Sequence, residues 1–258
     1  MAIAVAARSC IRVATAKPEQ RTPRTEASSR LPRVEHPRSI RSFVTRSGRI
    51  TEAQTRALEH LWPKYGIELD AQPLDLDAAF GRHAPRVVEI GFGNGENIAA
   101  LAGAHPERDY LGIEVHRAGV GRLMLAAEGA GLSNLRIICH DAVEVLERQL
   151  APDSLDEILI LFPDPWHKKR HHKRRLIQPT FIALAVSRLK RGGLLRLATD
   201  WEPYAVQMLE VLGSQAGLVN LSPDGGYAEK PVERVTTRFE KRGARLGHGV
   251  WDLAFRRA

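Results

Sequence analysis

The chain has 258 residues, of which 43% are hydrophobic and 26% are charged, the composition of a globular protein with a full core. No apolar stretch approaches the ~20 residues that span a bilayer, and two cysteines do not suggest a disulfide framework or a zinc site. These features exclude a membrane-spanning protein and favour a cytoplasmic one.

The net charge of +8 lies in residues 1–50, which hold 11 basic and 3 acidic side chains, whereas residues 51–258 hold 27 of each. We expect residues 1–40 to be a disordered basic arm, because their polar composition cannot bury enough apolar surface to fold alone. The arm fits three interpretations, which are contact with nucleic acid phosphates, a solvated tail without function, and a transit peptide. Residues 41–258 are expected to form a single domain.

Strands and helices alternate along the rest of the chain. A helix over 51–62 is followed by Pro63, and a polar, glycine-rich loop is expected over 222–249. The expected strands are 87–90, 109–115, 135–140, 156–162, 194–199 and 250–256, the last at the far side of the sheet, and the expected helices between them are 96–103, 117–130, 142–150, 173–190 and 203–212. Such an order predicts a mostly parallel sheet with helices on both faces.

A glycine-rich turn, EIGFGNG over 89–95, follows the first strand of this pattern. Gly91, Gly93 and Gly95 let the chain reverse tightly and let a ligand approach the backbone. The last glycine of the dinucleotide fingerprint is replaced by Glu96, which would repel a pyrophosphate at the start of the next helix. The turn therefore suits a nucleoside ligand without phosphates better than a nicotinamide cofactor.

Three acidic residues lie at or near the ends of successive strands, where open α/β sheets bind ligands. Glu114 is placed to accept hydrogen bonds from two ribose hydroxyls, and Asp141 to meet an adenine amino group. Glu89 lies inside an apolar strand without an obvious partner, so we expect it to face a ligand's ammonium group. These features match S-adenosylmethionine, although each acid by itself could simply cap a helix or pair on the surface.

The stretch LFPDPWHKKRHHKRRL over 161–176 places Asp164 between two prolines after the fourth strand. Trp166 is suited to stack on a base, and Lys168 with the neighbouring cations of 167–175 is suited to hold RNA phosphates. A solvated basic helix start is the plainer alternative.

Several motifs together resemble the bacterial tRNA (guanine-N7-)-methyltransferases, from about Ser39 to the C-terminus. They are VEIGFGNGE, YLGIEVH, HDAVEVL, FPDPWHKKRHHKRR, ATDWEPYA and TRFEKRGARLGHGVWDL. The resemblance implies a Rossmann-like class I methyltransferase fold with a seven-stranded sheet, and methylation of guanine N7 in the variable loop of tRNA. It implies S-adenosylmethionine as cofactor and tRNA as partner, with no metal and no obligate protein partner, in a monomer or homodimer.

The resemblance also implies a role for individual residues. Glu89, Glu114, Asp141 and Asp164 correspond to cofactor-contacting positions, and Asp164 is also the expected active-site acid. The corresponding substrate positions are Lys168, Asp200, Thr237, Arg238, Phe239 and Glu240. Asp200 and Glu240 are further candidates to accept hydrogen bonds from the guanine edge.

Three other functions are less consistent with the sequence. A small-molecule methyltransferase would share Glu89, Glu114 and Asp141, but it gives no reason for the basic stretch 167–175 or for residues 234–245. An RNA-binding module without catalysis conflicts with the intact acids, and a nicotinamide dehydrogenase is disfavoured by Glu96.

Overall fold

The computed structural model describes residues 40–44, 49–70, 72–236, 240 and 249–258. Apart from residue 40, the expected basic arm lies outside the described residues, as do Thr237, Arg238 and Phe239. The arm and the single domain over 41–258 therefore stay predictions. None of the helices in the described residues has the length and apolar character needed to cross a membrane.

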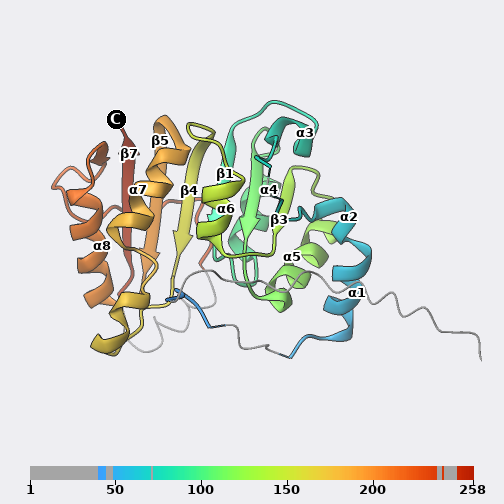
Figure 1. Cartoon of the computed structure of the whole chain (residues 1–258), viewed down its shortest axis with the longest axis horizontal. Coiled ribbons are helices and arrows are strands. Elements are labelled where there is room, and N and C mark those ends of the chain that lie inside the picture. Colours follow the sequence, from blue (N-terminus) through green and yellow to red (C-terminus); the bar gives the residue numbers. More distant parts are fainter. Residues whose placement is uncertain (1–39, 45–48, 71, 237–239, 241–248) are drawn as a thin grey trace, which may run out of the picture. The chain divides into compact units, whose positions relative to one another are not determined.

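Seven strands in the described part of the chain form one sheet with the order β3-β2-β1-β4-β5-β7-β6 (Figure 1). Strands β1 to β5 pair in parallel, and β7 runs antiparallel to both of its neighbours. The strands are β1 (Arg86–Ile90), β2 (Asp109–Ile113), β3 (Leu135–Ile138), β4 (Leu155–Leu161), β5 (Leu189–Thr199), β6 (Leu218–Asn220) and β7 (Trp251–Arg257). The predicted fold class, a mostly parallel seven-stranded sheet with covering helices, is confirmed.

The helices form two contacting groups. In one group α1 and α4 each contact α5, and in the other α6 and α8 each contact α7. Figure 1 shows α6 and α7 in front of the strands. The helices are α1 (Glu52–His60), α2 (Trp62–Tyr65), α3 (Leu76–Phe80), α4 (Glu96–Ala104), α5 (Arg117–Gly129), α6 (Ala142–Arg148), α7 (Pro179–Arg188) and α8 (Glu202–Ser214), with a 3₁₀ helix, η1, over Lys169–Arg174.

The expected helix over 173–190 is wrong in its first third. The chain forms η1 first, becomes extended at Gln178, and starts α7 at Pro179. Proline lacks the N–H of a helix interior and clashes with the preceding turn, but it fits the first helical position. Pro179 therefore marks the start of a new helix.

Two other differences concern the sheet. The strand expected over 250–256 at the far side of the sheet is β7, which lies on that side but one place in from the edge, because the short strand β6 was not predicted and pairs outside it. Strand β5 also begins five residues earlier than the predicted 194, directly after α7. The helices α2 and α3 were not predicted either, and Pro63, expected as a stop, lies in the first turn of α2.

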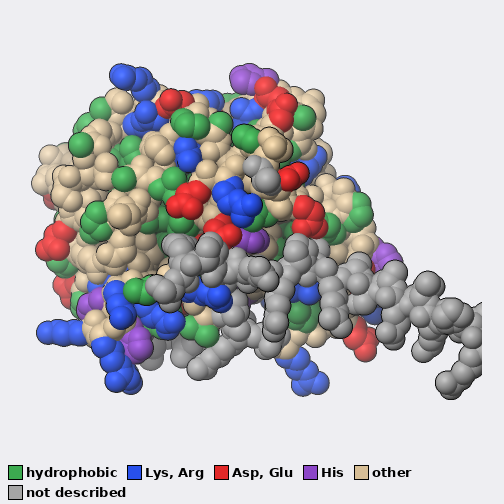
Figure 2. All heavy atoms as spheres, viewed as in Figure 1, with side chains coloured by type: hydrophobic (Ala, Val, Ile, Leu, Met, Phe, Trp, Pro, Cys, Tyr) green, Lys and Arg blue, Asp and Glu red, His purple; other side chains and the backbone are tan. Residues whose placement is uncertain are grey.

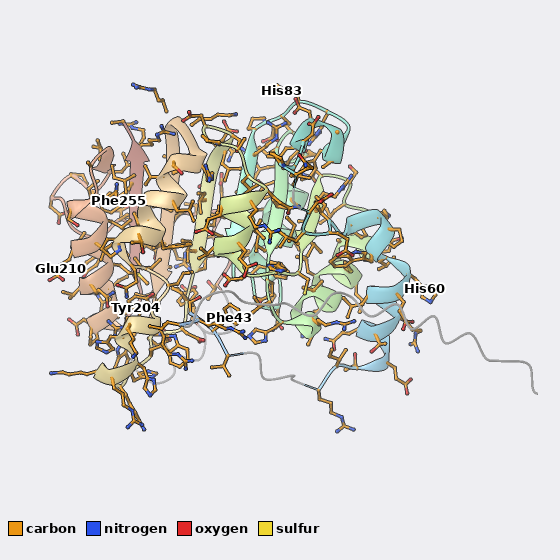
Figure 3. All side chains as sticks on the ribbon, viewed as in Figure 1. Phe43, His60, His83, Tyr204, Glu210 and Phe255 are labelled. Carbon is orange, nitrogen blue, oxygen red and sulfur yellow. The ribbon has the colours of Figure 1, made fainter. Side chains whose placement is uncertain are left out.

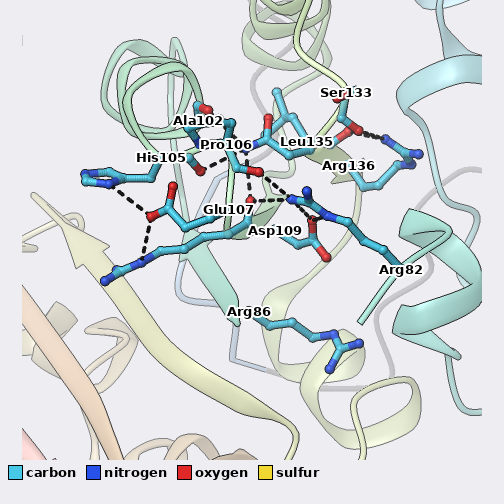
Figure 4. A network of polar contacts seen from close by, with 12 residues as sticks. Arg82, Arg86, Ala102, His105, Pro106, Glu107, Asp109, Ser133, Leu135 and Arg136 are labelled. Atoms are coloured by element: carbon cyan, nitrogen blue, oxygen red, sulfur yellow. Dashed lines mark hydrogen bonds and ion pairs between the residues drawn. The ribbon is translucent and has the colours of Figure 1, made fainter. Parts of the chain in front are cut away.

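The apolar strands place the core between the sheet and its helices. All five residues of β1 are buried, including Val88 and Ile90, as the near-continuous apolar pattern predicts for a central parallel strand. At the amino-terminal edge of the strands, Arg82 Nε donates to Asp109 Oδ1 at 2.8 Å, and the Asn134 amide donates to three backbone carbonyls (Figure 4). These hydrogen bonds join residues from different elements and hold this end of the strands, and the opposite end is left for the site.

Candidate active site

The site lies where the direction of the strand order reverses. The chain passes from β1 to β2 on one side, and β4 pairs with β1 on the other. The loops after β1 and β4 therefore separate and leave a crevice at the carboxyl ends of the strands. A cavity of about 290 Å³ occupies this place. Figure 3 labels Phe43, a lining residue of this cavity, at the same edge of the sheet.

Five predicted cofactor residues line this one cavity, from three different strand ends. They are Glu89, Gly91, Gly93, Glu114 and Asp141. Asp164 also lines it, at its exposed rim after β4. Gly95 does not line it. The structure thus brings together acids that are 75 residues apart in the sequence, because parallel strands end at a common edge.

The glycine turn is built for close approach. Gly91 and Gly93 have φ values of 71° and 58°, and a Cβ added to either would meet nothing within 4 Å. Gly95 has a different role, since its Cβ would lie 2.7 Å from Leu123 Cδ1, so the glycine allows α4 to pack against α5. The first two glycines leave open space beside the cavity, and the third serves packing.

Glu114 is held in place by backbone donors. Its Oε2 accepts from Gly93 N–H at 2.9 Å, and its Oε1 accepts from Val115 and His116 N–H at 2.7 and 3.0 Å. Asp141 caps α6 by accepting from Val143 N–H at 3.0 Å. The plain capping interpretation is therefore correct for Asp141, and it does not exclude ligand contact, because the residue also lines the cavity.

Glu89 is 2% exposed, and its Oε2 accepts a 2.8 Å hydrogen bond from Asn97 Nδ2. Burial raises the pKa of Glu89 to about 7, although the Asn97 bond opposes this rise and Glu114 adds to it. A cationic ligand group placed next to such a buried carboxyl would favour its ionised form and lower its pKa. Sequence reasoning missed Asn97, although its place just after the glycine turn was a usable signal.

Glu96, the first residue of α4, also lines the cavity. Its Oε1 lies 3.7 Å from Nη2 of Arg122 on α5. Its carboxylate takes the place where an anionic ligand would sit at the helix start. This supports the prediction that the turn does not serve a pyrophosphate.

Asp164 lies between two strained residues of the backbone. Phe162 and Trp166, on either side of the Pro163–Pro165 segment, have φ values of 51° and 46°. Such conformations cost roughly 1–3 kcal/mol each in non-glycine residues and cluster at functional sites. Partial withdrawal from water raises the pKa of Asp164, while His116 and His167 oppose the rise.

Trp166 holds the N-terminal segment 40–44 against the site. Its Nε1 donates to Ser42 O at 3.0 Å, and Ser42 and Phe43 line the cavity. The guanidinium of Arg174 lies 4.6 Å from the centre of the indole ring. The expected base-stacking role of Trp166 stays a prediction, and the contribution of Ser42 and Phe43 had no signal in the sequence.

The basic stretch divides into exposed cations and one structural residue. Lys168, Lys169, Arg170 and Lys173 are exposed in and around η1, and Figure 2 shows Lys and Arg side chains gathered at this end of the sheet. Arg175 is 3% exposed; it donates to Pro165 O at 2.8 Å and stacks over Tyr204 at 4.6 Å. Arg175 therefore supports the 163–166 loop and is not part of the exposed cations.

None of the predicted substrate residues that the structure describes, Lys168, Asp200 and Glu240, lines the cavity. Asp200 follows β5 and is partly buried, and its neighbour Trp201 packs edge-on against His167 with ring centres 4.4 Å apart. Glu240 is buried and bonds to Lys230 and Arg234 at 2.8 Å each. Asp200 thus lies beside the basic stretch, whereas Glu240 is part of an ion network.

Comparison with known proteins identifies the family. Residues 83–253 match a family described as putative methyltransferase. The chain is 58% identical over 222 residues to the tRNA (guanine-N(7)-)-methyltransferase of Paraburkholderia xenovorans, which covers 86% of this chain and 85% of the relative. The chain belongs to the tRNA (guanine-N7-)-methyltransferase family.

Two further comparisons agree with this membership. The tRNA (guanine-N(7)-)-methyltransferase of Methylococcus capsulatus is 54% identical over 228 residues, which are 88% of this chain and 98% of the relative. A crystal structure of the 16S rRNA methyltransferase KamB has a TM-score of 0.50 and 16% identity, and covers 85% of this chain and 99% of that one. At 16% identity, the similarity to KamB shows a shared fold.

Proposed function

We propose that this methyltransferase transfers the methyl group of S-adenosylmethionine to N7 of a guanine in the variable loop of tRNA. The observation that carries the proposal is that the acids at three strand ends and Asp164 line one cavity in a chain 58% identical to a protein of that activity. Because the substrate is tRNA, we place the reaction in the cytoplasm.

The donor set of the cavity fits the proposed cofactor. Glu89 would hold the ammonium group, Glu114 the ribose hydroxyls, and Asp141 the adenine amino group. Gly91 and Gly93 leave room for the ligand beside the backbone. The cofactor would supply an electrophilic methyl group.

Guanine N7 carries a lone pair on the edge of the base that faces the major groove. It needs no general base, so the chain's task is to place N7 in line with the methyl group. The base must leave its stack to reach the cavity. Methylation leaves a positive charge on the purine ring, and Asp164 at the cavity rim would stabilise that charge as it develops.

The exposed cations beside the cavity would bind the tRNA backbone. Lys168 lies four residues after Asp164, and we assign it to a phosphate together with Arg238. Asp200 would accept from the guanine edge, with Thr237 and Phe239 as further substrate residues. Glu240 keeps its assignment as a substrate residue, although its bonds to Arg234 and Lys230 favour an indirect role.

Incubation with labelled S-adenosylmethionine and bulk tRNA, followed by nuclease digestion and nucleoside chromatography, tests the function. The expected product is 7-methylguanosine, with no label in small-molecule acceptors. Label in another nucleoside, or none in tRNA, would contradict the proposal.

A further inference from the structure

Asn97 stands between two cavities. It is the second residue of α4, is 3% exposed, and lines both the site cavity and a neighbouring one of about 240 Å³. The second cavity is bounded by the segment 228–236, which includes Arg234 and follows β6 in the chain. Asn97 therefore provides one contact between the proposed cofactor site and this segment.

The side-chain amide of Asn97 acts as both a hydrogen-bond donor and an acceptor. Its NH₂ group donates to Glu89 Oε2 at 2.8 Å, and its Oδ1 accepts from Val235 N–H at 3.2 Å. An ionised carboxylate only accepts and a backbone N–H only donates, so these two partners fix one orientation of the amide. Turning the amide over would set its NH₂ group against the Val235 N–H.

The residue before Val235 connects this contact to the substrate side. Arg234 is buried, bonds to Glu240 and to Asp252 on β7, and lies with its guanidinium 5.5 Å from the centre of the Phe162 ring. Phe162 is the strained residue two places before Asp164. Holding Val235 therefore helps to hold Arg234, which in turn contacts the loop that carries the proposed active-site acid.

We propose that Asn97 is a positioning residue that couples occupation of the ammonium site at Glu89 to the placement of segment 228–236, and hence to tRNA binding. The inference rests on the proposed function. A ligand ammonium keeps Glu89 ionised, and an ionised Glu89 demands the amide orientation that also accepts from Val235. A protonated Glu89 is able to donate to the amide oxygen instead, which competes with the Val235 bond.

The test measures the dissociation constant of tRNA with and without saturating S-adenosylhomocysteine, using fluorescently labelled tRNA at pH 6, where Glu89, with its pKa of about 7, is mostly protonated without ligand. Coupling between sites is typically about 5- to 150-fold. We expect S-adenosylhomocysteine to tighten tRNA binding at least about fivefold in the parent protein, and less than about twofold in Asn97→Ala. Methylthioadenosine, which lacks the ammonium-bearing arm, should leave the parent's tRNA affinity nearly unchanged.

Alanine is a good helix residue, so Asn97→Ala should keep α4 and the fold, which circular dichroism checks. Asn97→Ser serves if the alanine variant fails to fold. His105→Gln is the matched control, because His105 lies 3.5 Å from Glu233 in the same segment but does not contact Glu89 (Figure 4 shows its other partner, Glu107). This control should keep the parent's coupling.

The coupling is the ratio of the tRNA dissociation constants measured without and with S-adenosylhomocysteine. A ratio near one in the parent protein overturns the proposal, and so does a ratio in Asn97→Ala that equals the parent's. Loss of coupling in His105→Gln as well would also overturn it, because tethering of the segment alone would then explain the effect. Failure of the proposed function looks different, since S-adenosylhomocysteine would not bind or tRNA would gain no 7-methylguanosine.

Discussion

Arg234 and Glu240 form a buried ion pair, with Arg234 Nη1 donating to Glu240 Oε2 at 2.8 Å. The same guanidinium bonds to Asp252 Oδ2 at 2.9 Å, so one cation holds acids from two separate parts of the chain. Removing one partner of such a network leaves buried charge uncompensated, whereas an exposed pair contributes little.

Arg234→Met should therefore destabilise the protein by about 3–5 kcal/mol. Chemical denaturation with a circular dichroism readout measures the change. Arg56→Met is the control, because Arg56 and Glu52 form an exposed pair and its loss should cost less than about 1 kcal/mol. Equal losses in the two variants would contradict a structural role for the Arg234 network.

Asp164→Asn should lower kcat on the order of a hundredfold or more, because asparagine keeps the shape but loses the charge that faces the developing cation. Affinity for tRNA should persist, since it depends on the cations. Single-turnover methyl transfer measures the effect. Asp200→Asn is the comparison, and its rate of methyl transfer should fall less than that of Asp164→Asn. Near-normal turnover in folded Asp164→Asn would move the active-site assignment to Asp200.

Glu114→Ala should weaken cofactor binding, because the ribose hydroxyls lose a charged acceptor at roughly 1.5–3 kcal/mol per bond. That corresponds to about 10- to 150-fold in Kd, measured by calorimetry with S-adenosylhomocysteine. Glu96→Gln changes another acid of the same cavity and should alter Kd less than about twofold. Unchanged affinity in Glu114→Ala would remove the ribose assignment.

Cofactor affinity should rise as pH increases through about 7, the raised pKa of buried Glu89. Binding of an ammonium group favours the ionised carboxylate, so binding at pH 6.5, where the ligand's amino group is itself protonated, should release about three-quarters of a proton. Calorimetry in buffers of different ionisation enthalpy counts these protons, and Glu89→Gln should abolish the release.

The same pKa makes Glu89 retain its proton on folding, so its contribution to stability falls as pH rises from about 4.5 to 7.

Lys168→Ala and Arg175→Ala should have different effects, although both residues belong to one basic stretch. Loss of exposed Lys168 should weaken tRNA binding and reduce the salt slope by about 0.7–0.9, one phosphate contact. Loss of buried Arg175 should lower stability by at least about 1.5–3 kcal/mol, the worth of one charged hydrogen bond. Binding titrations over a salt series and thermal melts separate the two, and an unchanged melt for Arg175→Ala would contradict its structural assignment.

The amino-acid sequence alone predicts the alternation of strands and helices, the glycine turn and the acids at the strand ends. These features depend on local periodicity and on a ligand's chemistry, and both are written in short stretches of residues. Glu89, Glu114 and Asp141 could be selected because each follows or interrupts an apolar strand, and parallel strands end at one edge. The start of α7 was also local information, since Pro179 was visible in the sequence.

The folded structure is needed to distinguish exposed from buried members of the basic stretch. Lys168 and Arg175 look alike in the sequence, but packing against Tyr204 and Pro165 buries one and leaves the other exposed. The Asn97 contact with Val235 joins residues 138 positions apart, and β6 pairs outside β7 through a connection that no local pattern specifies. Burial and long-range hydrogen bonds depend on which elements meet in three dimensions, so they became visible only once the chain was folded.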